Sequence, residues 1–468
     1  MTYSAAVPSA LHQQLCELLL KGYKQEDLCF GIYFESKGKE RKSALIHTII
    51  LPEEGDRNLH GNVSFNSQYL ERALQRAMEV KGGLVFMHSH FGPGWQGMSR
   101  QDIETEEKLA PSVKSSTGLP LLGMTIGTDG AWSGRFWIKS GPRQYDRHWC
   151  ATVRVVGPKL TVTYDEVQKP IPIPNPYLVR TVSVWGEEAQ SHMARLTVGV
   201  VGLGSVGAIV AESLVRMGLE DVRLIDFDIV KDHNLDRLLY ATREDAASGI
   251  RKIEAAAREL KKHATAANPA IREFPASVVE EEGYRRALDC DLLFCCVDRE
   301  WPRAILNELA YIHLIPVIDG GIYARTKPNG KMLHAIWNVH TVGPELQCLE
   351  CRGQFNMARV QLERNGFMDD PVYIKGLPQT DSIKHNENVF PFGLHCAAME
   401  LQQFVALTTF ANGVLNIGAQ RYNFMLGDLE KKEQKPCYSN CWYLQNKAKG
   451  DSAGASLIGE DPSIKKAG

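Results

Sequence analysis

The segment from residue 196 to 230, LTVGVVGLGSVGAIVAESLVRMGLEDVRLIDFDIV, constrains the fold more than any other part of the chain. It contains an apolar strand pattern, a glycine-rich turn, an amphipathic helix pattern and a second apolar strand pattern. This order is that of a βαβ unit, in which a helix connects two strands of one sheet. We therefore predict a Rossmann-like α/β domain with a mixed sheet in this region.

The glycine turn of this unit predicts a nucleotide site. Gly202, Gly204 and Gly207 lie between the strand and the helix, where bare amides and the helix dipole can receive phosphate. The glycine pattern alone is weak, because dehydrogenases and many other dinucleotide binders share it. Asp226 ends the next strand, where a carboxylate can bind ribose hydroxyls.

Polar residues farther along separate this chain from a dehydrogenase. Asn234 and Arg237 follow in DHNLDR, Lys252 ends ASGIRK, and Asp298 follows the apolar run LLFCCV. In this order and spacing, from about Tyr177 to Trp442, the segments resemble the adenylation domain of ubiquitin-activating-type enzymes. That group includes the activators of the molybdopterin and thiamine sulfur carriers.

The resemblance implies ATP and magnesium as cofactors. It implies that Asp226 binds the ATP ribose, that Arg237 and Lys252 contact phosphates, and that Asp298 holds magnesium, with Asn234 in the same binding set. Attack of a carboxylate on the α-phosphate builds negative charge, which cationic side chains and magnesium offset. The resemblance also places Arg180, in YLVRTVSVWG, at the phosphates of the partner subunit in a homodimer.

Cysteines form two pairs in the same region. The chain has eleven cysteines and no secretion signal, which favours metal ligands, catalysis or buried thiols over disulfides. CLEC contains Cys348 and Cys351, and CYSNC contains Cys437 and Cys441, enough for a tetrahedral structural zinc. One CxxC could equally be redox-active, but the activating family has a second pair near the domain's end.

The segment after the first cysteine pair is where the ubiquitin branch carries an acceptor cysteine. Only Cys396 occurs between residues 367 and 407, at the start of an apolar helix pattern. It could be a nucleophile or a buried packing thiol. Ser382 is an alternative oxygen acceptor.

FMHSHFGPGWQGMSRQD, residues 86 to 102, contains a second set of chemistry-bearing residues. The period of two of a strand places His88 and His90 on one face. Ser99 is a good helix N-cap, and Asp102 lies one turn into the helix, facing back toward the cap. Although an HxH pair alone is more often structural, two histidines and a carboxylate can hold a hydrolytic zinc with one open position.

With Ser99 and Asp102, this stretch resembles the signature of JAMM metalloproteases, H-x-H followed by S-x-x-D. That resemblance implies that Ser99 helps to hold the oxyanion and that a glutamate on an early strand is the general base. In QEDLCFGIYFES, Glu26 matches if Cys29 occupies the usual glycine position, whereas Glu35 lies at the far end of the strand. The spacer of eight residues between His90 and Ser99 is longer than the common seven, and Phe91 replaces the proline that usually follows the second histidine.

Four prolines in QKPIPIPNPYL predict a linker between two domains. We expect an N-terminal α/β domain of the JAMM (MPN) type at 1–167, the linker at 168–176, and the adenylation domain at 177–445. Residues 446–468 are rich in small and charged residues, which predicts a disordered tail.

The two sites together predict a bifunctional enzyme. It would adenylate the C-terminal glycine of a ubiquitin-like protein and cleave peptide or isopeptide bonds beyond that glycine. The fused order resembles proteins of bacterial ubiquitin-like conjugation operons, some of them antiviral, and implies a ubiquitin-conjugating-type partner. The alternatives are activation and trimming of a sulfur carrier, and a non-enzymatic scaffold, which the intact ligand sets disfavour.

Composition bears on partners and location. The formal net charge of −2 gives no reason to expect nucleic acid or anionic membrane as a partner. No run of about 18 apolar residues and no signal peptide pattern occurs, so we expect a cytoplasmic protein.

Overall fold

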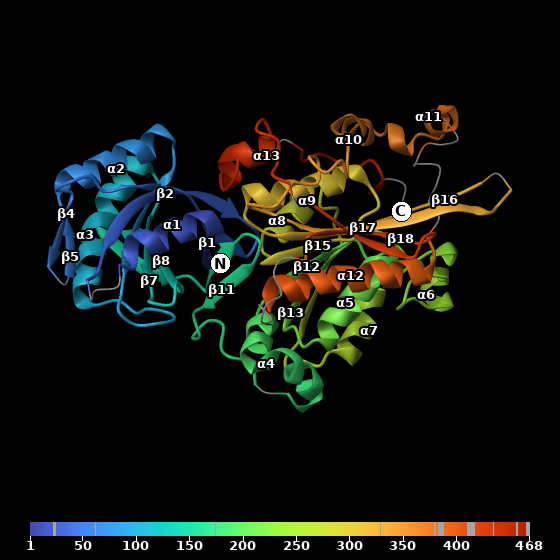
Figure 1. Cartoon of the computed structure of the whole chain (residues 1–468), viewed down its shortest axis with the longest axis horizontal. Coiled ribbons are helices and arrows are strands. Elements are labelled where there is room, and N and C mark those ends of the chain that lie inside the picture. Colours follow the sequence, from blue (N-terminus) through green and yellow to red (C-terminus); the bar gives the residue numbers. More distant parts are fainter. Residues whose placement is uncertain are drawn as a thin grey trace. The chain divides into compact units, whose positions relative to one another are not determined.

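The structure of the chain is a computed structural model with two compact units (Figure 1). The first unit comprises Met1–Ile171, Ile312–Leu314 and Asn446–Gly454, and the second contains the rest. The division between Ile171 and Pro172 falls within the predicted proline-rich linker. The described residues are 1–21, 25–60, 62–173, 175–327, 329–378, 381, 388–409, 417–433, 435–454 and 457–464.

The first unit is built on a nine-stranded sheet with the order β11-β10-β1-β3-β2-β6-β7-β8-β9. Its strands are β1 (Thr2–Pro8), β2 (Leu28–Lys37), β3 (Arg41–Ile50), β6 (Gly83–Ser89), β7 (Leu121–Ile126), β8 (Trp132–Gly141), β9 (Gln144–Trp149), β10 (Thr152–Val156) and β11 (Leu160–Tyr164). A separate hairpin joins β4 (Arg57–His60) to β5 (Asn62–Phe65). The helices are α1 (Ser9–Leu19), α2 (Ser67–Glu79) and α3 (Arg100–Thr117).

Alternation along β6 divides its side chains between the two faces of this sheet. Val85 and Met87 pack in the apolar core that includes side chains of α1. Leu84 and Phe86 pack in the opposite core, with side chains of α2 and α3. Since strand side chains alternate, His88 belongs to the face that α2 and α3 cover.

The second unit has an eight-stranded sheet with the order β14-β13-β12-β15-β16-β17-β18-β19. Pairing is parallel from β14 to β16 and antiparallel from β16 to β19, so the predicted Rossmann-like fold with a mixed sheet is confirmed. The strands are β12 (Thr197–Val201), β13 (Asp221–Ile225), β14 (Ala270–Phe274), β15 (Leu292–Cys295), β16 (Val317–Thr326), β17 (Met332–Val342), β18 (Ala419–Asn423) and β19 (Asp428–Lys432).

Helices cover both faces of this second sheet (Figure 1). On one face lie α5 (Ser205–Arg216), α7 (Lys252–His263) and α12 (Phe390–Thr408). On the other lie α8 (Glu281–Ala287) and α9 (Glu300–Ile312), which share a core with the four paired cysteines. The remaining helices are α4 (Val179–Ala194), α6 (Arg243–Ser248), α10 (Met357–Arg364), α11 (Pro371–Gly376) and α13 (Trp442–Gln445).

Described residues of the C-terminal segment, for which the sequence predicts disorder, form hydrogen bonds with the two units. In the first unit a 3₁₀ turn spans Gly450–Ala453, and Asp451 Oδ2 accepts a hydrogen bond of 2.9 Å from the backbone amide of Lys37. In the second unit the Leu457 carbonyl accepts a 2.8 Å bond from Trp301 Nε1. These hydrogen bonds hold described residues within 446–454 and 457–464, where the low apolar content alone gave no sign of such contacts.

No helix in the described ranges is both long enough and apolar enough to cross a membrane.

Two candidate catalytic sites

The first candidate site lies where the strand order of the second unit reverses. β12 pairs with β13 on one side and with β15 on the other. The chain therefore adds β13 and β14 on one side of β12 and then crosses to the other side for β15 and β16. The turn from Gly202 follows β12, and Asp298 lies in the segment after β15. Open α/β sheets bind ligands at such a reversal, outside the carboxyl ends of the strands.

Close packing requires glycine at two positions of the turn. Gly202 has φ of +89°, which residues with a side chain rarely adopt. A Cβ on Gly207 would lie 1.9 Å from the Gly202 carbonyl oxygen, so a side chain there would push the turn from the helix. Gly204 is the N-cap of α5 and would have open space around a Cβ.

Asp226 is tied to the glycine turn by its carboxylate. Its oxygens accept hydrogen bonds from the amides of Leu203, at 2.6 Å, and Asp228, at 2.7 Å. Burial raises the pKa of Asp226, while the charge of Lys252 lowers it. The side chain therefore fixes the shape of the turn at the place where the sequence predicts ribose binding.

Lys252 begins α7 and is 9% exposed. Its Nζ donates a 2.7 Å hydrogen bond to Asp228 Oδ2. Burial lowers the pKa of Lys252, but the charges of Asp226 and Asp228, joined by that of Asp298, outweigh burial and raise it. The predicted phosphate-contacting lysine is thus charged and lies in an acidic setting that includes the predicted magnesium ligand.

The sequence interpretation missed Asp228 and Asn388. The spacing of DFD in the sequence could have indicated Asp228, because alternate residues after a strand lie on one side. Asn388 donates from Nδ2 to Ser205 Oγ, at 2.7 Å, and thereby joins the segment before α12 to the start of α5. No local pattern predicts that contact, which spans 183 residues.

The other predicted nucleotide-site residues make local contacts. Asn234 Oδ1 accepts a 3.1 Å bond from the amide of Lys231, and Arg237 Nη1 lies 2.9 Å from Asp236 Oδ1. Arg180 lies in the first turn of α4. Among the described residues, no hydrogen bond or ion pair joins Arg180 to the glycine turn.

Of the two acceptor candidates, only Cys396 lies among the described residues. Cys396 lies in α12 with no exposed surface, and burial raises the pKa of its thiol well above the usual value. A reactive cysteine needs access and a depressed pKa, so the burial of Cys396 favours the packing interpretation over the acceptor interpretation. Ser382 lies outside the described residues.

The four paired cysteines come together in the second unit. Their sulfurs lie within 4.8 Å of one another, and Cys348 Sγ is 3.8 Å from Cys441 Sγ. Zinc–sulfur bonds of about 2.3 Å place the corners of a tetrahedron about 3.8 Å apart. Hydrogen bonds from Cys348, Cys441 and Cys351 lower the pKa of Cys437 to about 6, whereas the hydrogen bond to Cys437 raises the pKa of Cys348 and burial raises that of Cys441. The four sulfurs therefore fit a structural zinc ion.

The second candidate site lies in the first unit and joins His88, His90 and Asp102. The two histidine Nε2 atoms are 3.2 Å apart. Asp102 Oδ1 lies 3.5 Å from His88 Nε2, and Asp102 Oδ2 lies 3.3 Å from His90 Nε2. Zinc bonds of about 2.0–2.1 Å separate tetrahedral corners by about 3.3 Å, so the spacing of the three side chains suits a zinc ion.

Two reciprocal hydrogen bonds at the start of α3 position Asp102. Ser99 is the N-cap, and its Oγ accepts a 3.2 Å bond from the Asp102 amide, while Asp102 Oδ2 accepts a 2.7 Å bond from the Ser99 amide. Burial raises the pKa of Asp102, but its contacts with His88 and His90 outweigh burial and hold it well below the usual range. Ser99 Oγ keeps its own hydrogen free to donate.

Of the two candidate bases, Glu26 and not Glu35 has its pKa affected by the charges of this cluster. Burial raises the pKa of Glu26, with smaller opposing effects of His90, which lowers it, and Asp102, which raises it. Glu35 instead forms ion pairs with Lys37, at 2.8 Å, and Lys42. A carboxylate with a raised pKa beside the three ligands suits a general base.

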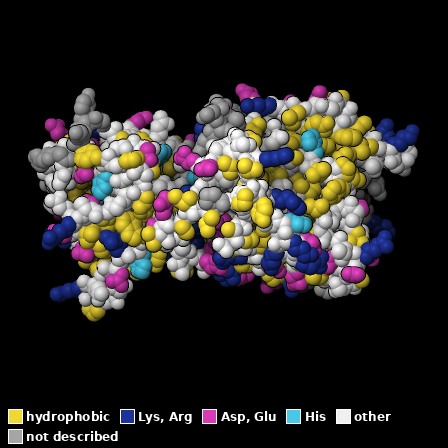
Figure 2. Space-filling model, turned by 90° about the horizontal axis from the view of Figure 1, so that it is seen from below, with side chains coloured by type: hydrophobic (Ala, Val, Ile, Leu, Met, Phe, Trp, Pro, Cys, Tyr) yellow, Lys and Arg dark blue, Asp and Glu magenta, His cyan; other side chains and the backbone are white. Residues whose placement is uncertain are grey.

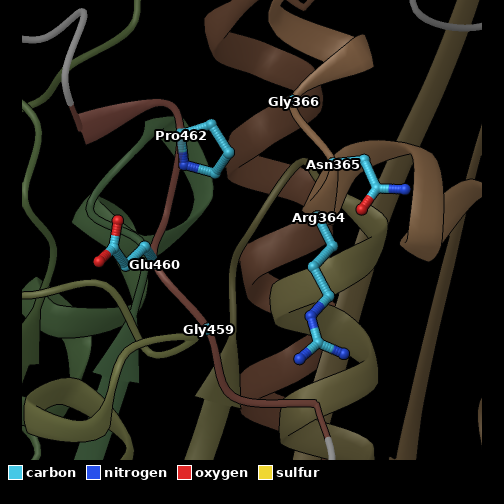
Figure 3. A pocket seen from close by; sticks show the side chains of 6 residues that line it. All are labelled: Arg364, Asn365, Gly366, Gly459, Glu460 and Pro462. Carbon is cyan, nitrogen blue, oxygen red and sulfur yellow. The ribbon is translucent and has the colours of Figure 1, made fainter.

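A separate cavity of about 410 Å³ lies between the end of α10 and the C-terminal segment (Figure 3). Arg364 Nη2 donates a 3.1 Å hydrogen bond to the Ile458 carbonyl beside it. No residue that the sequence singled out lines this cavity. Its lining residues are Arg364, Asn365, Gly366, Gly459, Glu460 and Pro462.

A Rossmann-like sheet with a glycine turn, the buried Asp226 and the partly exposed Asp228 at its strand reversal defines the class of the second unit. The model of the ThiF family matches residues 178–437, more than half of the chain. The chain therefore belongs to the ThiF family. The first unit up to Ile171 precedes the matched range.

Known relatives are similar over parts of this range. The sulfur carrier protein adenylyltransferase of Thermus thermophilus is 30% identical over 140 residues, which are 30% of this chain and 49% of that protein. The ubiquitin-like modifier-activating enzyme 5 of Drosophila willistoni is 29% identical over 140 residues, 27% of this chain and 33% of that protein. The chain thus spans less than half the length of either relative. The crystal structure of E. coli MccB with ATP has a TM-score of 0.44 and 16% identity, and the similarity covers 58% of this chain and 75% of that one.

Proposed function

We propose that the second unit adenylates the C-terminal carboxylate of a small ubiquitin-like or sulfur-carrier protein with ATP. Membership in the ThiF family and the names of the two relatives support this proposal. The observation that carries it is the hydrogen-bonded arrangement of Asp226, Asp228 and Lys252 beside the glycine turn.

In this proposal a carboxylate oxygen of the carrier protein attacks the α-phosphate of ATP, and pyrophosphate leaves. The amides of the glycine turn and the start of α5 face the phosphates. Lys252 and Arg237 offset the charge that builds on them, and Asp226 accepts from the ribose hydroxyls. Magnesium, which Asp298 would hold, would neutralise further phosphate charge when bound.

We further propose that the first unit hydrolyses peptide or isopeptide bonds next to the carrier's C-terminal glycine, as in the JAMM metalloproteases that it resembles. The spacing of His88, His90 and Asp102 supports a zinc ion there, which would lower the pKa of a water molecule at its open position. Glu26 would take the proton of the attacking water, and Ser99 would donate to the developing oxyanion.

The experiment that tests the adenylation is ATP–pyrophosphate exchange with purified carrier proteins of ubiquitin-like fold. Wild-type protein should exchange label only when a carrier with an intact C-terminal glycine is present. Lys252→Ala should lower the exchange rate about 100-fold or more, because it removes a charge that offsets the transition state. Exchange that is equal in the wild type and Lys252→Ala would contradict the proposal.

Sulfur-carrier metabolism is the second candidate pathway, and the name of the T. thermophilus relative favours it. Intact-mass analysis of the carrier after incubation with ATP distinguishes the two pathways. A thiocarboxylate, formed with a sulfur donor present, indicates sulfur transfer. An ester or amide with another protein indicates conjugation and a ubiquitin-conjugating-type partner, in a bacterial and antiviral setting that the fused domain order suggests.

We also propose that the second unit acts as a homodimer, with Arg180 reaching the phosphates of the neighbouring subunit. The outer face of α12 carries an apolar groove of about 430 Å³, and hydrophobic side chains gather on this side of the second unit (Figure 2). Light scattering at micromolar concentration tests the dimer. A monomer with full exchange activity would exclude it.

A further inference from the structure

A group of fully buried polar side chains lies behind the His88, His90 and Asp102 cluster. Glu106 on α3, Thr125 on β7 and Arg135 on β8 each have no exposed surface. Trp137, also on β8, is 2% exposed. Neither the nucleotide site nor the hydrolytic chemistry proposed above uses any of them.

Arg135 connects the members of this group. Its Nε donates a 3.0 Å hydrogen bond to Glu106 Oε2, and Nη2 pairs with Glu106 Oε1. Its Nη1 donates at 2.6 Å to Thr125 Oγ1, which lies 3.4 Å from His88 Nε2. Trp137 Nε1 donates to the same carboxylate of Glu106, at 2.6 Å. One guanidinium therefore contacts both the helix of Asp102 and the strand beside His88.

The backbone leaves space for this arrangement. In the parallel pairing of β6 with β7, His88 is the register partner of Thr125. A Cβ on Gly123, two residues earlier on β7, would lie 2.3 Å from Glu106 Oε2, so the glycine leaves room for the carboxylate. Glu106 is four residues after Asp102 and thus on the same side of α3.

A gain in stability does not by itself explain why these polar side chains are buried here. A buried ion pair loses so much hydration that well-packed hydrophobic residues in its place are often neutral or stabilising. What the pair provides here is a set of directed contacts between three elements, α3, β7 and β8.

We infer that Arg135 is a positioning residue for the metal ligands: through Glu106 and Thr125 it sets the separation of Asp102 from His88 that a tetrahedral zinc ion requires. This inference rests on the proposed zinc function of the cluster. Because His88 Nε2 is the atom that would bind zinc, Thr125 Oγ1 holds this ring by packing against it and not by a hydrogen bond. Groups outside the ligands that orient them typically contribute about 10- to 100-fold to metal affinity.

The test measures zinc affinity of the full-length protein by competition with a chelator. Thr125→Val keeps the volume of the side chain and removes the oxygen that Arg135 contacts, whereas Thr125→Ser retains that oxygen. We expect zinc affinity at this cluster to fall at least tenfold in Thr125→Val and Arg135→Lys, and to recover in Thr125→Ser. The difference in bound zinc between the wild type and His88→Ala gives the amount of zinc that this cluster binds.

A second fully buried arginine of the same unit supplies the control. Arg154 lies on β10, also without exposed surface. Arg154→Lys should leave the zinc affinity within about twofold of the wild type, although it changes a buried arginine in the same way. A cobalt-substituted sample adds a second readout, because displaced ligands would change the visible absorption of cobalt bound at this cluster.

The outcomes separate the inference from the function on which it rests. Equal zinc content in the wild type and His88→Ala would overturn both. Zinc bound by the wild type, with unchanged affinity and unchanged cobalt spectrum in Thr125→Val and Arg135→Lys, would overturn the positioning role alone. An equal loss of affinity in Arg154→Lys would also overturn it.

Discussion

Glu26, just before β2, and Glu35, near the end of β2, show how neighbouring charges decide what a carboxylate can do. Glu35 is paired with two lysines, which outweigh burial and lower its pKa. Glu26 forms no such pair with the described residues, and burial raises its pKa. A carboxylate held ionised by lysines is a weak base, whereas one with a raised pKa beside the ligand cluster accepts a proton more readily.

Glu26→Gln should therefore abolish cleavage while the protein keeps its zinc. The change removes the proton acceptor and leaves His88, His90 and Asp102 in place, so we expect a loss of about 10²- to 10⁴-fold in cleavage rate. Cleavage of a carrier fusion and metal analysis provide the measurement. Glu35→Gln is the matched control, and a comparable loss there would show that the early strand is assigned wrongly.

Glu308 is a buried carboxyl group that neither proposed site uses. It has no exposed surface, and Tyr284 OH donates a 3.2 Å hydrogen bond to its Oε1. Burial raises the pKa of Glu308 to about 7. The folded state thus binds this proton more tightly than the unfolded state, so the protonated carboxyl contributes stability below about pH 4.5, and that contribution is lost as pH rises to about 7.

Glu308→Gln should remove this pH dependence, since an amide does not ionise. Relative to the wild type, the variant should gain about 3 kcal/mol in unfolding free energy at pH 7.5 compared with pH 4.5. Urea unfolding of the second unit at the two pH values measures the difference. The exposed Glu281→Gln on α8 is the control, and a similar gain there would contradict the burial argument.

At the scale of elements, the connection from β12 to α5 depends on the size of one residue. Gly207→Ala would place a methyl group against the Gly202 carbonyl and force α5 away from the turn. Gly204→Ala meets open space and keeps the backbone as it is, since Gly204 has φ of −75°. The two substitutions therefore test packing and ligand approach separately.

We expect Gly207→Ala to destabilise the second unit by about 1–3 kcal/mol and to lower nucleotide affinity. Gly204→Ala should leave the melting temperature unchanged and weaken nucleotide binding only, because its methyl group lies where phosphate approaches the amides. Thermal unfolding with and without ATP distinguishes these effects. Equal melting temperatures for the two variants would show that the contact at Gly207 is easily relieved.

Elements with a strong local pattern could be predicted from the sequence. The apolar runs and glycines of β12, α5 and β13 predict their order, and the period of two along β6 places His88 and His90 together. Contacts between distant elements could not be predicted, because the chain path brings their residues together. Lys252 with Asp228 and Arg135 with Glu106 are such pairs, and the hydrogen bonds of the C-terminal segment belong to the same class.

At the scale of the whole molecule, each unit has its own interior. The apolar clusters of the first unit contain residues up to Val155, and the cluster around α8, α9 and the cysteines contains residues from Val201 onward. Each compact unit should therefore keep its own site when the other site is altered. The first unit also includes Asn446–Gly454 from the far end of the chain, so a truncation at the linker would remove part of it.

Point variants of the full chain are thus the correct test of independence. Asp298→Ala removes the expected magnesium ligand and should abolish ATP–pyrophosphate exchange while cleavage of a carrier fusion stays near the wild-type rate. His88→Ala should do the reverse, because it removes a zinc ligand in the other unit. The measurement is a two-by-two comparison of exchange and cleavage rates, each normalised to folded protein. A loss of more than about tenfold in cleavage by Asp298→Ala, roughly 1.4 kcal/mol of transition-state stabilisation, would show that the two sites are coupled.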